Sequence, residues 1–319
     1  VYKRQERMLR CPHCGNLIYP KIAPAILVAV THGDKLLMTR YQGRAYKGYA
    51  LIAGFTEIGE TAEDTVRREV MEEVLLEADQ LTKPVVAVFL GADETLYQGH
   101  RVTGTYSLQE AAKACVRLVT GHEPSIGWTE EEAAAIAREK AASLSREQKY
   151  FRGLYTGGTF AEETLMTFRA VAPEIALHTN RDNTKYAARL QTHKRSEGHT
   201  LLDMGDLDFT AEAPHTVFDP TQRVERLRQE LADPEVALVA MDIILGPGVA
   251  PDPASCYVPL MRSRPDVIYV CAVCGGEGDP QGKDDIARML REAGAVVADS
   301  NYESARLCAM ICRQLGRRE

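Results

Sequence analysis

The sequence contains no apolar run of the roughly 18 residues that a membrane-spanning helix requires. Basic residues are in the minority, because 38 Lys and Arg stand against 45 Asp and Glu and give a net charge of −7. Eight cysteines in 319 residues do not suggest a disulfide framework, and the polar start is unlike a secretory signal. We therefore expect a cytoplasmic protein with neither a membrane nor a nucleic acid as partner.

The remaining composition is that of an ordinary globular protein. Hydrophobic residues make up 45% of the chain and charged residues 26%, and a length of 319 residues predicts about two domains. The first five residues fit neither of the resemblances described below, and we interpret them as a translated adapter sequence.

The most specific motif spans residues 54–73, with the sequence GFTEIGETAEDTVRREVMEE. Its glycine, arginine and four key glutamates are Gly54, Glu60, Arg68, Glu69, Glu72 and Glu73. The last three glutamates stand at i, i+3 and i+4, so a helix over residues 61–73 would place them on one face. Mg²⁺ and Mn²⁺ prefer such hard oxygen ligands and share them with phosphates. A solvated acidic face is the alternative for three glutamates alone, but the full spacing favours a metal-pyrophosphate site.

This motif resembles the Nudix box, and the residues before it resemble the NADH pyrophosphatase branch of the Nudix hydrolases. The resemblance covers about residues 8–74 and includes two predicted strands, 26–30 and 35–38. It implies Mg²⁺ or Mn²⁺ bound by Glu69, Glu72 and Glu73, with catalytic roles for Glu72, Glu73 and Arg68. The family's box continues with a glycine where this chain has Leu75, and the similarity ends there.

Two CxxC pairs are candidate zinc ligands. Cys11 and Cys14 match one half of the family's four-cysteine zinc ribbon, and a structural zinc almost always has four ligands. Cys271 and Cys274 could complete the set, but they lie in an apolar run that predicts a buried strand. We therefore expect at most a weak Zn²⁺ site at the first pair.

The larger part of the chain, from about residue 75 to 316, carries motifs of a second family. They are residues 82–91, 107–112, 152–159, 198–206, 214–220 and 242–248. These motifs resemble those of the FdrA-type proteins related to succinyl-CoA synthetase, and they occur in the same order along the chain. The resemblance implies acyl or carbamoyl transfer and, in some members, a role in purine or allantoin nitrogen breakdown.

The hydrophobic pattern of this part predicts a doubly wound α/β fold with a parallel, flavodoxin-like sheet. Central strands are expected at residues 237–244, 268–273 and 296–298, because these runs lack polar alternation and need helices on both faces. Helical stretches between and after them are residues 222–231, 284–292 and 302–315. The run at residues 83–91 also predicts a strand buried on both faces.

The two resemblances predict four segments. They are an adapter with half a zinc ribbon at 1–21, a partial Nudix domain at 22–74, a CoA-ligase-like segment at 75–147 and a CoA-ligase-like flavodoxin-fold domain at 148–319.

Residues 153–159, GLYTGGT, form a glycine-bearing turn between a predicted strand and a predicted helix. Backbone amides at such a helix start bind phosphates or carboxylates, and glycine lets the ligand approach closely. A turn required only for packing is the alternative. We predict a ligand at Gly157, Gly158 and Thr159, namely a small phosphate or carboxylate substrate, CoA or a nucleotide.

The synthetase relatives have a second glycine-rich helix start, which corresponds here to residues 204–208, MGDLD. Gly205 is a further ligand-binding candidate, although the two aspartates of this segment disfavour an anion. The relatives' phosphohistidine motif is absent after Gly91, so its role is not carried over to His100.

Loop residues supply the remaining candidates. His215 and Asp219 could form an acid/base pair, and a turn whose polar side chains satisfy backbone groups is the alternative. Asp242 and Asp252 lie at a strand end, on the edge where doubly wound sheets bind ligands.

Three functions remain open from the sequence. The first is FdrA-like acyl or carbamoyl transfer, and the second is Nudix hydrolysis of NADH or another nucleoside diphosphate derivative. The third is a chimeric fragment without catalytic activity. A second subunit or a homo-oligomer is compatible with all three.

Overall fold

The computed structural model describes residues 81–317, apart from 92–93, 182–183, 212 and 277. Before residue 81 it describes short stretches only: 9–10, 17–18, 25–28, 31–32, 35–36, 39–40, 49–50, 52–55, 65, 68, 71, 75–76 and 78–79. The chain divides into two compact units, Val1–Gly104 and Thr105–Glu319.

The first unit contains short antiparallel strand pairs in its described residues. The strands are β1 (Leu9–Arg10), β2 (Leu17–Ile18), β3 (Ala25–Val28), β4 (Thr31–His32), β5 (Lys35–Leu36), β6 (Thr39–Arg40), β7 (Tyr49–Ala50) and β8 (Ile52–Phe55). β1 pairs with β2, β3 with β8, β4 with β5, and β6 with β7. Every described residue from 65 to 79 is helical.

The strand predicted in residues 83–91 forms, but its predicted burial is wrong. β9 (Val85–Val88) is partly exposed at all its positions. Among the described residues it pairs only with β10 (Val102–Thr105), outside the large parallel sheet. An apolar run buries both faces of a strand only where layers cover the sheet on both sides, and a two-stranded ribbon does not provide them.

The second unit is built on a parallel sheet of seven strands in the order β13-β12-β14-β11-β15-β16-β17. The strands are β11 (Tyr150–Tyr155), β12 (Leu177–Thr179), β13 (Ala188–Arg189), β14 (His199–Asp203), β15 (Val236–Ile244), β16 (Ile268–Cys274) and β17 (Val296–Ala298). The three strands predicted from apolar runs correspond to the last three, and all three are parallel. The central position is confirmed for β15 and β16, whereas β17 is an edge strand and is partly exposed at two of its three positions, because no strand of the described residues pairs with its outer side in the sheet. β15 is buried along almost its whole length, as a strand without polar alternation requires.

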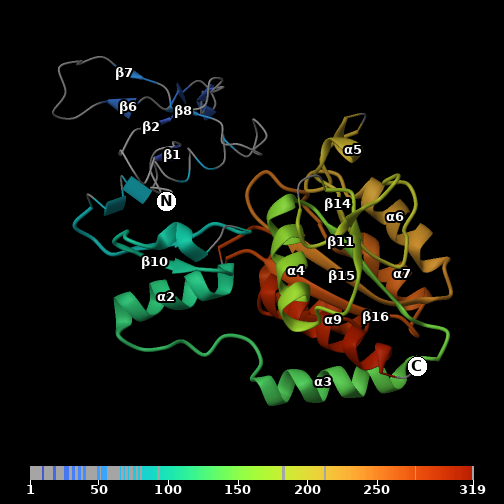
Figure 1. The fold of residues 1–319 in the computed structure, drawn as a ribbon. Helices are drawn as coiled ribbons and strands as arrows, with labels where there is room; N and C mark the ends of the chain where they lie inside the picture. The colour runs from blue at the N-terminus through green and yellow to red at the C-terminus, as the bar shows by residue number, and fades with distance from the viewer. Residues whose placement is uncertain are drawn as a thin grey trace. The chain divides into compact units, whose positions relative to one another are not determined.

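Helices cover both faces of this sheet (Figure 1). The covering helices are α3 (Glu130–Ser143), α4 (Gly158–Val171), α6 (Thr221–Leu231), α7 (Val258–Ser263), α8 (Lys283–Glu292) and α9 (Asn301–Gly316). The second unit also contains α2 (Leu108–Thr120), α5 (Leu207–Thr210) and the 3-10 turn η2 (Ser255–Tyr257), and the first unit contains the 3-10 turn η1 (Glu94–Tyr97). One core cluster joins the sheet to α3, α4 and α9, and the other joins it to α6, α7 and α8. The result is the expected three-layer α/β architecture.

The strand order indicates where a sheet of this type binds its ligands. Without the edge strands β12 and β13, the order is β14-β11-β15-β16-β17, which is second, first, third, fourth and fifth along the chain. This is the flavodoxin-like order, and such sheets bind ligands where the order reverses, at the carboxyl ends of the strands. Here the reversal lies at β11, between β14 and β15.

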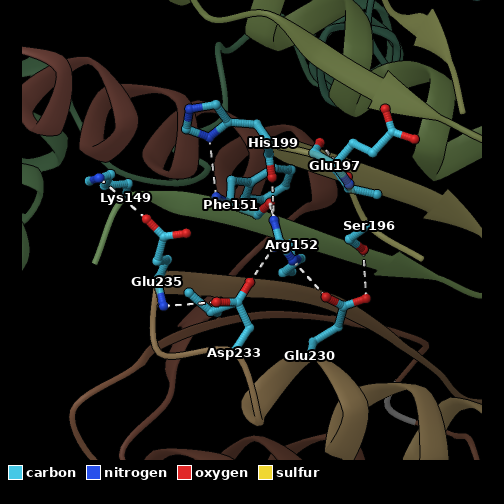
Figure 2. Close-up of polar contacts among 12 residues, drawn as sticks. Lys149, Phe151, Arg152, Ser196, Glu197, His199, Glu230, Asp233 and Glu235 are labelled. Atoms are coloured by element: carbon cyan, nitrogen blue, oxygen red, sulfur yellow. Dashed lines mark hydrogen bonds and ion pairs between the residues drawn. The ribbon is translucent and has the colours of Figure 1, made fainter. Parts of the chain in front are cut away.

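A buried ion network holds the other end of this sheet together (Figure 2). Glu230 of α6 accepts hydrogen bonds from Nε of Arg152 at 2.6 Å and from Nε of Arg226 at 2.5 Å. Ser196 also donates to Glu230, at 2.7 Å, and Asp233 accepts from Arg152 at 2.9 Å. One carboxylate therefore connects β11, α6 and the segment before β14.

His199 makes folding pH-dependent at the same end of the sheet. Its Nδ1 accepts a hydrogen bond from the Phe151 amide at 3.1 Å, which requires a neutral ring nitrogen (Figure 2). Burial, aided by the positive charge of Arg152, lowers the pKa of His199 from 6.5 to about 4. The unfolded chain therefore takes up a proton at a higher pH than the folded chain.

We expect the free energy of unfolding to be unaffected by His199 above pH 6.5. As the pH falls from 6.5 towards 4, protonation of His199 in the unfolded chain should lower this free energy by about 1–3 kcal/mol. Trp128, the one tryptophan of the chain, reports unfolding of the second unit by fluorescence. His199→Asn, whose side-chain oxygen can accept the same hydrogen bond, should show a smaller loss over this pH range. Equal losses in both proteins would contradict the assignment.

Candidate functional site

The carboxyl ends of β11, β14 and β15 meet at the point where the strand order reverses. The turn after β11 contains Gly157 and Gly158, and the turn after β14 contains Gly205. The two turns lie side by side, because the Met204 amide donates to the Tyr155 carbonyl at 2.8 Å. The structure thus brings together all the predicted ligand-binding glycines, although they come from segments about fifty residues apart.

The start of α4 offers open backbone donors. Gly157 is the N-cap residue and makes no side-chain cap, and the first turn contains no acidic residue. The amides of Gly157, Gly158 and Thr159 have no hydrogen-bond partner among the described residues, and these three positions are partly or fully exposed. Together with the helix dipole, such amides attract an anion.

Arg181, which the sequence analysis did not select, adds a positive charge beside these amides. A Cβ atom placed on Gly158 would lie 2.3 Å from its Nη1, so only glycine leaves room for the guanidinium. Arg181 donates to Asp203 at 2.7 Å and to Glu162 at 3.3 Å. Burial raises the pKa of Asp203, while Arg181 and the Gly205 amide oppose that rise. Arg181 lies between β12 and β13, and no local pattern in the sequence marks it.

Gly205 allows close packing of the two turns. A Cβ atom there would lie 2.5 Å from the Thr156 carbonyl and 2.6 Å from Nε2 of His215. His215 uses Nδ1 to accept a hydrogen bond from the Val217 amide at 3.2 Å. The ring is therefore held with Nε2 against Gly205, next to the predicted ligand-binding turn.

The loop aspartates act mainly on the backbone. Asp206 caps α5, and Asp219 accepts from the amide of Thr221 at 2.9 Å and from its hydroxyl at 2.6 Å. Asp252 likewise accepts from the Ser255 amide at 3.0 Å. Among the described residues, no hydrogen bond joins the Asp219 carboxylate to the His215 ring, although the Asp219 amide donates to the His215 carbonyl. The two residues thus make the contacts of a polar turn.

Asp242 differs from these aspartates because it is completely buried at the end of β15. It accepts hydrogen bonds from the Thr156 amide at 2.9 Å, from the Thr156 hydroxyl, and from Nη2 of Arg223 at 2.7 Å. Asp242 therefore fixes the residue that precedes Gly157. Thr156 and Arg223 are further site residues that the sequence analysis did not find.

The predicted metal ligands are not placed by the structure. Glu69, Glu72, Glu73, Cys11 and Cys14 lie outside the described residues. Arg68 is described as helical and partly buried. Within the described part of the chain, no group of three or more His, Cys, Asp or Glu side chains could hold a metal ion.

The second CxxC pair is in β16, as the apolar run predicted. Burial raises the pKa of the Cys271 and Cys274 thiols to about 12. Zinc binds the thiolate, so these buried thiols are poor ligands.

Comparison with known families separates the chain into two parts. A NUDIX domain model matches residues 21–139, and a CoA-ligase model matches residues 154–311. The chain therefore has a part similar to NUDIX domains and a part similar to CoA-ligases. The NUDIX match runs past Leu75, where the resemblance read from the motifs ends. None of the described helices is long and apolar enough to span a membrane.

Individual relatives agree with this division. "Uncharacterized protein YahF" of Escherichia coli K12 is 32% identical over 253 residues, which are 76% of this chain and 48% of YahF. "NAD-capped RNA hydrolase NudC" of Pseudomonas syringae pv. syringae is 47% identical over 74 residues, 23% of this chain and 27% of that protein. The NudC of Pectobacterium atrosepticum is 41% identical over 81 residues, 25% of this chain and 31% of that protein.

The chain thus spans about half the length of YahF and less than a third of these two NudC proteins. Among solved structures, PH0766 from Pyrococcus horikoshii OT3 aligns with 77% of this chain and 55% of its own, at 10% identity and a TM-score of 0.28.

Proposed function

We propose that the CoA-ligase part of the chain transfers an acyl or carbamoyl group, as the resemblance to FdrA-type proteins implies. The observation that supports this function is the open start of α4, with the Gly157 and Gly158 amides beside Arg181. The site lies where a flavodoxin-like sheet binds its ligands. A small carboxylate or phosphate is the ligand that these donors suit.

The chemistry of this site follows from its charges. Amides and a guanidinium stabilise negative charge on a substrate oxygen, and they do so best where water is excluded. Arg181 uses Nε and Nη1 for Glu162 and Asp203, which leaves Nη2 for a ligand among the described contacts. Asp203 limits the net positive charge, so the site suits a monoanion or a single phosphate better than a polyphosphate.

The same donors fit one phosphate of CoA or of a nucleotide, and they are the residues that would hold it. CoA supplies a thiol that accepts acyl groups. Within this chain, Gly157, Gly158, Thr159 and Arg181 bind and orient the anionic group, while Asp242 holds Thr156 and thereby the turn. His215 lies with Nε2 at the edge of the turn, where it can exchange a proton with a bound ligand.

Anion binding tests this proposal. Titration with inorganic phosphate, acetate or oxamate should shift the amide NMR signals of Gly157 and Gly158. Arg181→Gln should weaken binding about 10- to 100-fold, because a charge-assisted hydrogen bond contributes about 1.5–3 kcal/mol. Arg169→Gln, in the last turn of the same helix, is the matched control and should bind as the unmodified chain does. Equally weakened anion binding in both variants, or NMR shifts confined to the amides of other residues, would contradict an anion site at the start of α4.

A second candidate function is hydrolysis of the pyrophosphate in NADH or another nucleoside diphosphate derivative. It is supported by the NUDIX match and by the nearly complete box from Gly54 to Glu73. Glu69, Glu72 and Glu73 would hold Mg²⁺ or Mn²⁺, which neutralises a pyrophosphate during attack by water. A chimera without activity is the third possibility, and it would fail both the anion titration and a hydrolysis assay.

A further inference from the structure

A small cavity lies below the candidate site, between the end of β15, the segment before α6 and the segment around η2. Its volume is ≈ 10 Å³, close to the space that one water molecule needs. Thr156, Thr216, Arg223 and Tyr257 carry polar groups in its lining, and the other lining residues are apolar. None of the predicted anion-binding residues lines it.

Two buried polar atoms around this cavity have no hydrogen-bond partner among the described residues. They are Nε of Arg223 and Oγ1 of Thr216. The two residues are only 2% and 3% exposed, so bulk solvent does not satisfy these atoms. Arg223 already uses Nη2 for Asp242 and for the Leu154 carbonyl. Leaving such groups unpaired is destabilising, because they lose their hydrogen bonds to water on burial.

We propose that one ordered water molecule binds in this cavity and bridges Arg223 to Thr216. The positive charge of Arg223 is balanced by Asp242 at 2.7 Å, so the cavity favours a neutral ligand over an anion. The water oxygen accepts a hydrogen bond from the Nε–H of Arg223, and the water donates one hydrogen bond to Oγ1 of Thr216. The water donates its second hydrogen bond to Oγ1 of Thr156, and the Thr156 hydroxyl itself donates a hydrogen bond to Asp242. These three partners are typical for a buried water.

The water connects two segments that border the candidate site. Thr216 follows His215 directly, and Thr156 precedes Gly157. A bridge between Thr216, Arg223 and Thr156 therefore fixes the histidine loop against the ligand-binding turn. This inference does not depend on the proposed transferase activity.

Thr216→Val tests the water by the sign of its effect on the melting temperature. With a dry cavity, the Thr216 hydroxyl is an unpaired buried group, and its removal should raise the Tm. With the water present, valine removes one of its partners, and the Tm should fall by about 2–6 °C. Thr216→Ser keeps the hydroxyl and is the matched control, which should lose less than the valine variant.

A crystal structure of the unmodified chain provides the second measurement and does not depend on how the variants fold. We expect solvent density within hydrogen-bonding distance of Nε of Arg223 and Oγ1 of Thr216. An empty cavity, a protein atom paired with Nε, or a Tm that rises in Thr216→Val would overturn the proposal.

Discussion

Replacing Glu230 by glutamine is expected to lower the free energy of unfolding of the second unit by about 3–5 kcal/mol. The carboxylate of Glu230 is the shared partner of Arg152 and Arg226, at 2.6 and 2.5 Å. All three side chains are at most 5% exposed. Loss of the negative charge leaves two guanidinium groups buried. Among the ion pairs of the described residues, Arg152 then keeps the more exposed Asp233 as its partner.

Urea unfolding followed by Trp128 fluorescence measures this effect. Glu235→Gln is the control, because Glu235 pairs with Lys149 at 3.3 Å while both side chains are at least 40% exposed. An exposed pair contributes about 0–1 kcal/mol, so this variant should behave almost as the unmodified chain. A loss below about 1 kcal/mol in Glu230→Gln would show that the buried network does not stabilise the fold.

Hydrolysis of NADH by the purified chain with Mn²⁺ is expected to be slow or absent. The box supplies carboxylates for the metal, but turnover also requires the phosphate and the water to be held in line, which contributes about 7–11 kcal/mol. After the box, the motifs resemble those of the FdrA-type proteins. β9, which follows, is partly exposed and pairs only with β10 among the described residues. The expected loss relative to a complete site is therefore several orders of magnitude in rate.

The assay follows release of mononucleotide and compares the chain with a Glu72→Gln, Glu73→Gln double variant. Both proteins should give the same background rate. The NUDIX match up to residue 139 is the observation that argues for the opposite result. Rapid, metal-dependent turnover that the double variant lacks would place pyrophosphate hydrolysis ahead of group transfer.

Much of the fold was predictable because it is encoded locally. β15 and β16 come from apolar runs whose lack of polar alternation calls for burial on both faces. The run of β17 also forms a strand, but at the edge of the sheet, where it is partly exposed. The helices between them follow from periodicity, and the glycine pair at the start of α4 marks a strand-to-helix turn. β9 shows the limit of this reasoning, since the same kind of run stays partly exposed where the neighbouring layers are different.

The residues that complete the site could not be read from local pattern. Arg181 approaches Gly158 from the connection between β12 and β13. Arg223 reaches Asp242 from α6, which packs on the opposite face of the sheet from α4. Each contact depends on which strands are neighbours, and the order of strands is a property of the whole sheet. The sequence by itself therefore determined the strands, the helices and the glycine turn. Only the tertiary structure decided which charges surround that turn, because those side chains are far apart along the chain and meet only after the sheet has formed.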